Sequence, residues 1–408
     1  MKSKPWLWEA IIYQVLIDRF FPGGRGGRRD AVSSSDGRIP PAFCGGNLQG
    51  VVEKLNYLAD LGINTLWLSP FNQTQSEAYH GYHVTDFFRV AEQFGGPAGF
   101  KALIKTARAR GIRLIMDFVP NHVSREHPWF VKAKNRRDPH HDWFYWRPHG
   151  DYLKYFDVAE LPKLNLDHPA ARAEIIRAAK YWLDQGVDGF RLDHAIGPSL
   201  DFWRAFRTAL KGHNPAVVLI GEVAFGGLRE PWLETIQLPN KEFYFAADAG
   251  GLDVMDDTLR EYVEVFDGLL DFQFHKILNA LVAHARRPLP TTAIQALLDR
   301  HYAGFPTDCC LLSFLDNHDK NRFLFEAGQD KERLQRAAQI QFAQRHPPGI
   351  YYGTELGLSQ SRPIMATEPY SDQQARRLMA WEWGDPGILD FYKRLIQDRK
   401  SPRGRAPA

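Results

Sequence analysis

The feature that most constrains this chain is a local unit that recurs along it: a helical segment, a glycine, a short apolar run and a polar end. The clearest copy is DQGVDGFRLD at residues 184–193, where Gly186 precedes an apolar run that ends on Asp193. A glycine suits the left-handed position that commonly follows a helix. Apolar runs of this length alternating with helical segments predict repeated βα units and a parallel sheet.

Four of these units carry a carboxylate at the end of the apolar run or just past it. One such carboxylate could simply cap the next helix. Four of them converge, because the carboxyl ends of parallel strands lie on one edge of the sheet, where catalytic groups gather. The sequence therefore predicts a carboxylate site made of Asp117, Asp193, Glu222 and Asp319.

Eight apolar runs in the 408 residues read as strands, which predicts a (β/α)8 TIM barrel. A doubly wound open sheet is the alternative, but the glycine-rich phosphate motif that would favour it after the first strand is absent. The expected strands are residues 11–17, 64–68, 113–119, 187–192, 217–221, 266–274, 311–315 and 349–353.

The βα alternation stops between residues 120 and 167, a stretch rich in His, Trp and Pro. We expect this stretch to be a small domain inserted after strand 3, with the barrel made of residues 1–119 and 168–400. The Gly- and Arg-rich residues 23–38 are expected to be a mobile loop, and residues 401–408 a disordered tail.

Composition indicates a globular protein and gives no sign of a nucleic-acid-binding or membrane-spanning one. A hydrophobic content of 44% supports a sizeable core, and a net charge of +3 gives no indication of a nucleic-acid partner. No apolar run is long enough to span a membrane. The first residues show no secretory signal, so we expect a cytoplasmic protein, although a mature exported chain would look the same. The three cysteines, Cys44, Cys309 and Cys310, have no metal-binding spacing. Cys309 and Cys310 adjoin an apolar run and are expected to be buried thiols rather than a disulfide.

Five short stretches, in this order, resemble motifs of the α-amylase family, glycoside hydrolase family 13. Each is weak alone, but their ordered conjunction is specific and covers nearly the whole chain. The LPKLN stretch resembles the neopullulanase and cyclomaltodextrinase branch. The stretches are DFVPNH at 117–122, LPKLN at 161–165, GFRLD at 189–193, GEV at 221–223 and FLDNHD at 314–319.

The resemblance implies a retaining enzyme in which Asp193 is the nucleophile, Glu222 the general acid/base and Asp319 a transition-state stabiliser. Retaining glycosidases use two carboxyl groups about 5 Å apart. Arg191 shares a strand face with Asp193 and is expected to keep it ionised. Glu222 has no cation near it in the sequence, so we expect its pKa to be raised and Glu222 to be the acid.

Five residues are expected to bind substrate. Tyr82 offers a flat face for a sugar ring, Arg191 orients the nucleophile, and His122 and His318 donate to hydroxyls; packing is the alternative for the tyrosine and the two histidines. Asp117 ranks below the other carboxylates because it could only buttress the site.

Many members of the resembled family hold calcium, and Asn121 matches one ligand position. Gly197 stands where a carbonyl-donating histidine is often found, and residues 22–29 are Gly and Arg where another calcium loop is rich in Asp. We therefore expect no required cofactor or metal and activity without added calcium. The C-terminal β-domain common in the family, and the N-terminal domain of the LPKLN branch, are expected to be absent.

The expected activity is hydrolysis of α-1,4-glucosidic bonds in maltooligosaccharides or starch-like chains. This α-glucan or maltooligosaccharide is the expected partner, and no nucleic acid or membrane partner is expected. Two alternatives remain: a transglycosylase or exo-acting α-glucosidase of the same mechanism, and a non-catalytic sugar-binding homologue. The sequence does not indicate an oligomeric state.

Overall fold

The computed structural model describes residues 5–24, 42–147, 150–224, 252–365 and 371–401. The predicted loop at 23–38 and tail at 401–408 lie almost entirely outside the described residues. The chain divides into two compact units. The first contains Met1–Ser69, Gln93–Leu114 and Asp271–Ala408, and the second contains Pro70–Glu92 and Ile115–Leu270.

Eight parallel strands form a closed barrel in the order β1-β10-β9-β8-β7-β6-β5-β2. The predicted (β/α)8 barrel is therefore confirmed, and closure excludes the open doubly wound sheet. The strands are β1 (Ile12–Val15), β2 (Thr65–Leu68), β5 (Arg113–Phe118), β6 (Gly189–Leu192), β7 (Val218–Gly221), β8 (Gly268–Leu270), β9 (Cys310–Phe314) and β10 (Pro348–Tyr351).

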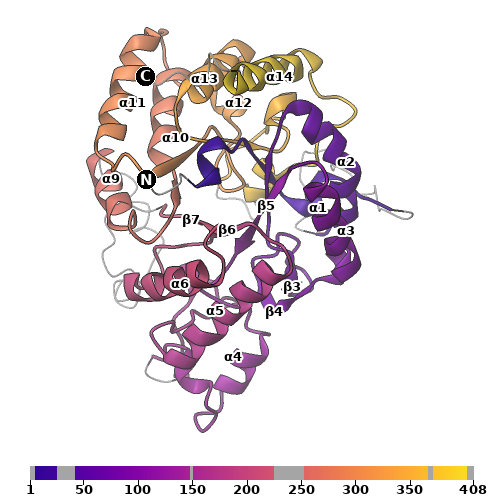
Figure 1. Ribbon diagram of the computed structural model, residues 1–408, viewed down its shortest axis with the longest axis vertical. Helices are drawn as coiled ribbons and strands as arrows, with labels where there is room; N and C mark the ends of the chain where they lie inside the picture. Colours follow the sequence, from indigo (N-terminus) through magenta and orange to yellow (C-terminus); the bar gives the residue numbers. More distant parts are fainter. Residues whose placement is uncertain (1–4, 25–41, 148–149, 225–251, 366–370, 402–408) are drawn as a thin grey trace. The chain divides into compact units, whose positions relative to one another are not determined.

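The first unit contributes β2, β1, β10 and β9, which pair in that order. Tyr13 lies opposite Leu66 on one side and Ile350 on the other, and all three are buried. Figure 1 shows α2 beside α3 and α13 beside α14, and these pairs are in contact. The helices of this unit are α1 (Ile17–Phe20), α2 (Leu48–Leu61), α3 (Gly96–Arg108), α10 (Phe272–Leu278), α11 (Thr291–Ala303), α12 (Phe323–Glu326), α13 (Lys331–Ala343) and α14 (Pro386–Lys400).

The second unit contributes β5 to β8, and its register positions the candidate site. Asp117 on β5 pairs with Arg191 on β6, and Leu192 pairs with Gly221 on β7. Asp193 and Glu222 therefore follow neighbouring strands at the same level. Gly186 has φ 104°, which confirms the predicted left-handed residue after the helix. The helices of this unit are α4 (Pro128–Ala133), α5 (Pro169–Asp184), α6 (Leu200–His213) and α9 (Leu252–Glu261), with α5 beside α6 in Figure 1.

Residues 120–167, the predicted insertion, contain α4 and short antiparallel bridges in place of βα units. His122 bridges Lys163 and Phe144 bridges Leu164. Aromatic rings fill the interior, with Phe130 against Phe144 at 4.9 Å and against Tyr152 at 4.7 Å between ring centroids.

Two strand predictions need correction. The sixth strand, expected at 266–274, is only β8, because the side chain of Asp271 accepts from Phe274 N at 2.8 Å and caps α10. No strand was predicted from the sequence between β2 and β5, where the structure has an antiparallel pair of β3 (Asn72–Thr74) and β4 (Val84–Val90). Cys309 and Cys310 are buried free thiols, as predicted, and Cys44 is a buried free thiol as well.

Candidate active site

One buried guanidinium joins three of the predicted carboxylates in the second unit. Arg191 is 1% exposed, and its Nη1 donates to Asp117 Oδ1 and to Asp193 Oδ1, each at 2.8 Å. Its Nη2 pairs with Glu222 Oε1. The β5-β6-β7 register brings these side chains together from three strand ends. Three negative groups around one cation leave an excess of buried negative charge.

The electrostatic argument for separate roles of Asp193 and Glu222 is wrong. Arg191 pairs with both residues, because β6 and β7 are neighbours and Glu222 follows directly after its strand. Burial raises the pKa of Asp193 well above its ordinary value; Arg191 opposes this rise, whereas Glu222 and Asp117 add to it. Arg191 was expected to keep Asp193 ionised, but desolvation outweighs this effect of Arg191 and raises the pKa of Asp193.

Both carboxylate oxygens of Asp117 accept hydrogen bonds from other side chains of the protein. It is fully buried; Oδ1 accepts from Arg191, and Oδ2 accepts from the Tyr82 hydroxyl at 2.8 Å. The arrangement matches the buttressing alternative for Asp117. Through this contact Asp117 also fixes the orientation of the Tyr82 ring.

His122 lies in an aromatic and amide environment. Its ring stacks on Tyr155 with centroids 4.5 Å apart, and Asn121 Nδ2 is 3.3 Å from Nδ1. Burial lowers the pKa of His122 to about 3, so the imidazole is neutral. Because an amide NH₂ only donates, Nδ1 is the acceptor and Nε2 carries the proton. The sequence did not predict this contact with Tyr155, because no motif near the LPKLN stretch indicated it.

A tight turn follows Asp193. His194 has φ 44°, an uncommon conformation for a residue with a side chain, and its N–H donates to Glu222 Oε2 at 2.9 Å. Gly197 N donates to His194 O at 2.9 Å and closes the turn. A Cβ at Gly197 would overlap Asn121 Oδ1, so a larger residue here would displace the Asn121 side chain. In the sequence, Gly197 was noted only as a departure from the calcium-binding pattern of the family, without this role.

Lys163 of the LPKLN stretch connects this turn with the end of β5. It is 6% exposed, and Nζ donates to Asn121 Oδ1 at 2.6 Å and to Gly197 O at 2.8 Å. Burial lowers the pKa of Lys163 to about 7. Among the described residues no cluster of three or more His, Cys, Asp or Glu side chains could hold a metal ion.

The two remaining predicted residues, His318 and Asp319, belong to the first unit and follow β9. His318 Nδ1 is 2.8 Å from Gln14 Nε2, and its Nε2 is 3.0 Å from Asp319 Oδ2. Since the Gln14 amide nitrogen donates, the proton of His318 lies on Nε2 and points to Asp319. His318 thus contacts Asp319 directly, which the sequence did not predict.

Arg376 is a partner of Asp319 that sequence reasoning missed. Its Nη2 donates to Asp319 Oδ1 at 2.8 Å and its Nε to His318 O at 2.9 Å. Arg19, buried at 1% exposure, donates from Nε to Arg376 O at 3.1 Å. No local pattern links residues so far apart in sequence.

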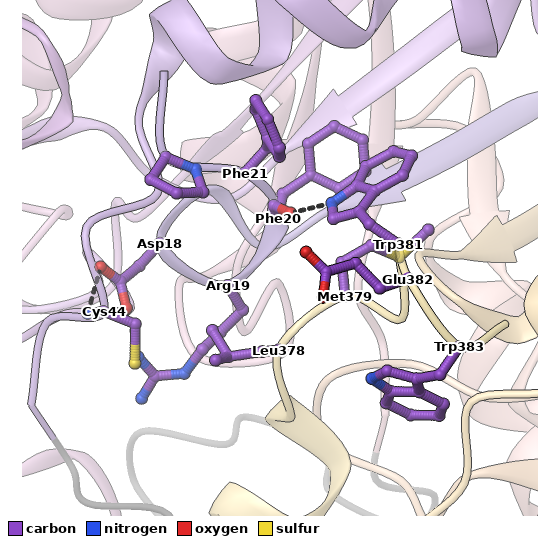
Figure 2. Close-up of a pocket in the computed structure, with 11 residues that line it drawn as sticks. Asp18, Arg19, Phe20, Phe21, Cys44, Leu378, Met379, Trp381, Glu382 and Trp383 are labelled. Carbon is purple, nitrogen blue, oxygen red and sulfur yellow. Dashed lines mark hydrogen bonds and ion pairs between the residues drawn. The ribbon is translucent and has the colours of Figure 1, made fainter. Parts of the chain in front are cut away.

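A cavity of about 260 Å³ lies in the first unit beside Arg19. Figure 2 shows the Asp18 carboxylate hydrogen-bonded to Cys44, and the Trp381 indole donating to the Phe20 carbonyl, at 2.6 Å. Its aromatic and apolar wall includes Trp383, which is 60% exposed. The cavity therefore adjoins the buried Arg19 that supports Arg376.

A closed parallel barrel with carboxylates after successive strands defines a class of barrel proteins with chemistry at the strand ends. The chain matches the family model "Alpha amylase, catalytic domain" over residues 14–151 and 149–389. It belongs to the alpha-amylase family, which confirms the resemblance seen in the sequence.

Individual relatives agree with this assignment. The chain is 35% identical to Alpha-amylase 2 of Dictyoglomus thermophilum over 400 residues, covering 97% of this chain and 64% of the relative. It is 31% identical to a cyclomaltodextrinase of a Bacillus species over 416 residues, covering 97% and 66%. The solved cyclic alpha-maltosyl-(1→6)-maltose hydrolase of Arthrobacter globiformis matches with TM-score 0.80 and 26% identity, covering 98% of this chain and 84% of that one. The chain thus spans slightly under two thirds of the length of these two curated relatives.

Proposed function

We propose that this chain is a retaining glycoside hydrolase that cleaves α-1,4-glucosidic bonds in maltooligosaccharides or starch-like chains. The observation that carries the proposal is the pairing of Asp193 and Glu222 with the two terminal nitrogens of the same guanidinium. This arrangement is compatible with the separation of about 5 Å that double displacement requires. The relatives named amylase, cyclomaltodextrinase and maltose-derivative hydrolase support an α-glucan as substrate.

In this mechanism the carboxylate of Asp193 attacks the anomeric carbon while Glu222 protonates the departing glycosidic oxygen. The resulting β-glycosyl ester on Asp193 is then cleaved by water, which Glu222 deprotonates, and the product regains the α configuration. The motif positions GFRLD and GEV assign these roles. Both acids contact Arg191, and the acid step requires that Glu222 holds a proton when the leaving group departs.

The other predicted residues act on the sugar ring. Asp319 holds hydroxyl groups more tightly as the oxocarbenium-like state forms, and His318 and Arg376 orient it. Tyr82 provides a stacking face fixed by Asp117. The neutral His122 donates from Nε2 to a hydroxyl.

Chromatography of maltoheptaose products over time tests this function, with Asp193→Asn as the inactive control. We expect a series of shorter maltooligosaccharides from the wild-type chain and none from the variant. Products longer than heptaose would instead indicate a transglycosylase, and glucose alone from the outset an exo-acting enzyme. Sugar binding without turnover would overturn the proposal in favour of a binding homologue.

A further inference from the structure

Lys163 is a buried amine whose hydrogen-bond partners are both neutral. The Asn121 side-chain oxygen and the Gly197 carbonyl receive its two hydrogen bonds, at 2.6 and 2.8 Å. Burial disfavours the charged form of this amine more than the attraction of Asp167 favours it. Burying an amine between neutral oxygens is costly, so this position lowers the stability of the fold.

Three separate segments meet at Lys163 Nζ. Asn121 follows β5, Lys163 lies in residues 120–167 opposite His122, and Gly197 follows β6. The backbone at Gly197 approaches the Asn121 side chain so closely that a Cβ there would displace Asn121 Oδ1 from its position beside Lys163. Two oxygens of different segments are thus arranged around one positive group, as they would be around a bound cation.

The contacts of Lys163 lead to the proposed reaction centre by two routes. Because Lys163 occupies Asn121 Oδ1, the Asn121 amide nitrogen faces His122 Nδ1, which places the imidazole proton on Nε2. Because Lys163 holds Gly197 O, it fixes the turn whose first N–H, that of His194, donates to Glu222 Oε2.

We propose that Lys163 is a built-in cation that replaces a bound metal ion between Asn121 and Gly197 and that positions His122 and Glu222. This inference rests on the proposed function for its catalytic part. Calcium takes six to eight oxygen ligands, among them carboxylates. The site offers two neutral oxygens and already contains an amine, so the residues do not fit calcium.

Lys163→Met tests the positioning role because it keeps the apolar stem and removes the N–H donors. Glu222 is needed to protonate the leaving group of maltoheptaose but hardly for α-maltosyl fluoride, since fluoride departs with little protonation. We expect kcat on maltoheptaose to fall by about tenfold or more, and kcat on the fluoride by about threefold or less, with KM changing little.

Lys211→Met is the matched control. Lys211 also donates to a backbone carbonyl, that of Val217, and it pairs with Asp267 at 2.8 Å. Val217 and Asp267 directly precede β7 and β8, at the amino ends of the strands, whereas Asp193 and Glu222 follow the carboxyl ends. This variant should lose stability but keep the ratio of the two rates. An equal loss on both substrates in Lys163→Met, as in the control, would overturn the positioning role.

Lys163→Asp tests the replacement of a metal without measuring activity. It puts a carboxylate beside Asn121 Oδ1 and Gly197 O, so millimolar calcium should raise its melting temperature and leave that of the wild-type chain unchanged. Wild-type activity should also survive chelation. A wild-type chain that loses activity in EDTA and regains it with calcium, or a Lys163→Asp variant indifferent to calcium, would contradict the inference. If the wild-type chain hydrolyses neither substrate, the proposed function fails. The effect of calcium on the melting temperature of Lys163→Asp still decides whether Lys163 replaces a metal ion.

Discussion

At the scale of single residues, Arg191 links three carboxylates of the candidate active site. One guanidinium, 1% exposed, contacts Asp117, Asp193 and Glu222 from neighbouring strands. Removing one partner from such a buried ion pair costs about 3–5 kcal/mol, because the other charges are left uncompensated. Substitutions of these residues therefore affect stability as well as chemistry, and informative variants keep the charges in place.

Tyr82→Phe is such a variant. It keeps the stacking face and removes the hydroxyl that donates to buried Asp117 Oδ2. We expect a loss of about 1.5–3 kcal/mol in the free energy of unfolding, the value of a hydrogen bond to a charged group. Its kcat on maltoheptaose should remain well above that of Tyr82→Ala. Urea unfolding and steady-state rates check both points, and equal rates for the two variants would show that the ring does not stack on sugar.

The roles of Asp193 and Glu222 differ in their dependence on the leaving group. Asp193→Ala should remove turnover of every substrate, because no covalent intermediate forms. Glu222→Ala should lose maltoheptaose hydrolysis and retain part of its turnover of α-glucosyl fluoride. Fluoride release, measured with an ion-selective electrode, separates the two. Turnover of the fluoride by Asp193→Ala but not by Glu222→Ala would reverse the assignment.

The candidate carboxylates were predictable from the sequence, because Asp117, Asp193 and Glu222 each end an apolar run and Asp319 lies just past one. Their partners were not predictable. Arg376 reaches Asp319 across 57 residues, and Lys163 reaches Asn121 across 42. The absence of a cation near Glu222 in sequence was misleading, because strand pairing places Arg191 there.

At the scale of elements, the strands with continuous apolar runs were predictable because both of their faces are buried. The errors lie where a polar side chain changes the local structure. Asp271 interrupts an apolar run and begins α10, which shortens the expected sixth strand. The β3-β4 hairpin was missed because burial along β4 does not alternate strictly.

Helix α13 provides a prediction about capping. The Asp330 side chain accepts from Glu332 N at 2.9 Å and from Arg333 N at 3.1 Å. Asp330→Ala should lower the free energy of unfolding by about 1 kcal/mol. Asp330→Asn keeps the accepting oxygen and should stay within a few tenths of a kcal/mol of the wild-type value. Urea titration of both variants checks this, and equal losses would show that charge rather than capping matters.

At the scale of the whole molecule, buried histidines and buried carboxyl groups have opposite effects on the free energy of unfolding as the pH falls. Burial lowers the pKa values of His122, His127 and His346 to about 3. The unfolded chain binds protons at these histidines below about pH 6.5 and the folded chain does not, so stability falls as the pH falls towards 3. Burial raises the pKa values of Asp18, Asp316 and Glu355, which acts in the opposite direction.

His346→Gln isolates one of these contributions, because the carboxyl groups are common to both proteins and cancel in the comparison. His346 Nδ1 accepts from Leu311 N at 3.2 Å, so protonation would break this contact. Between pH 7 and pH 5 the wild-type chain should lose about 2 kcal/mol more stability than the variant. Urea unfolding at the two pH values measures the difference. Parallel losses would show that His346 takes up its proton without unfolding.

The described part of the chain contains no helix long and apolar enough to cross a membrane. The barrel, its family and the carboxylates at its strand ends support the proposed hydrolysis, in which the configuration at the anomeric carbon is retained.

The most direct test of this central claim is a proton NMR time course of maltoheptaose hydrolysis, recorded before the new reducing ends mutarotate. Double displacement through Asp193 predicts that the α-anomer appears first and the β-anomer accumulates later by mutarotation. A β-anomer appearing first would mean that water attacks the anomeric carbon directly, and would contradict the proposed roles of Asp193 as nucleophile and Glu222 as acid/base.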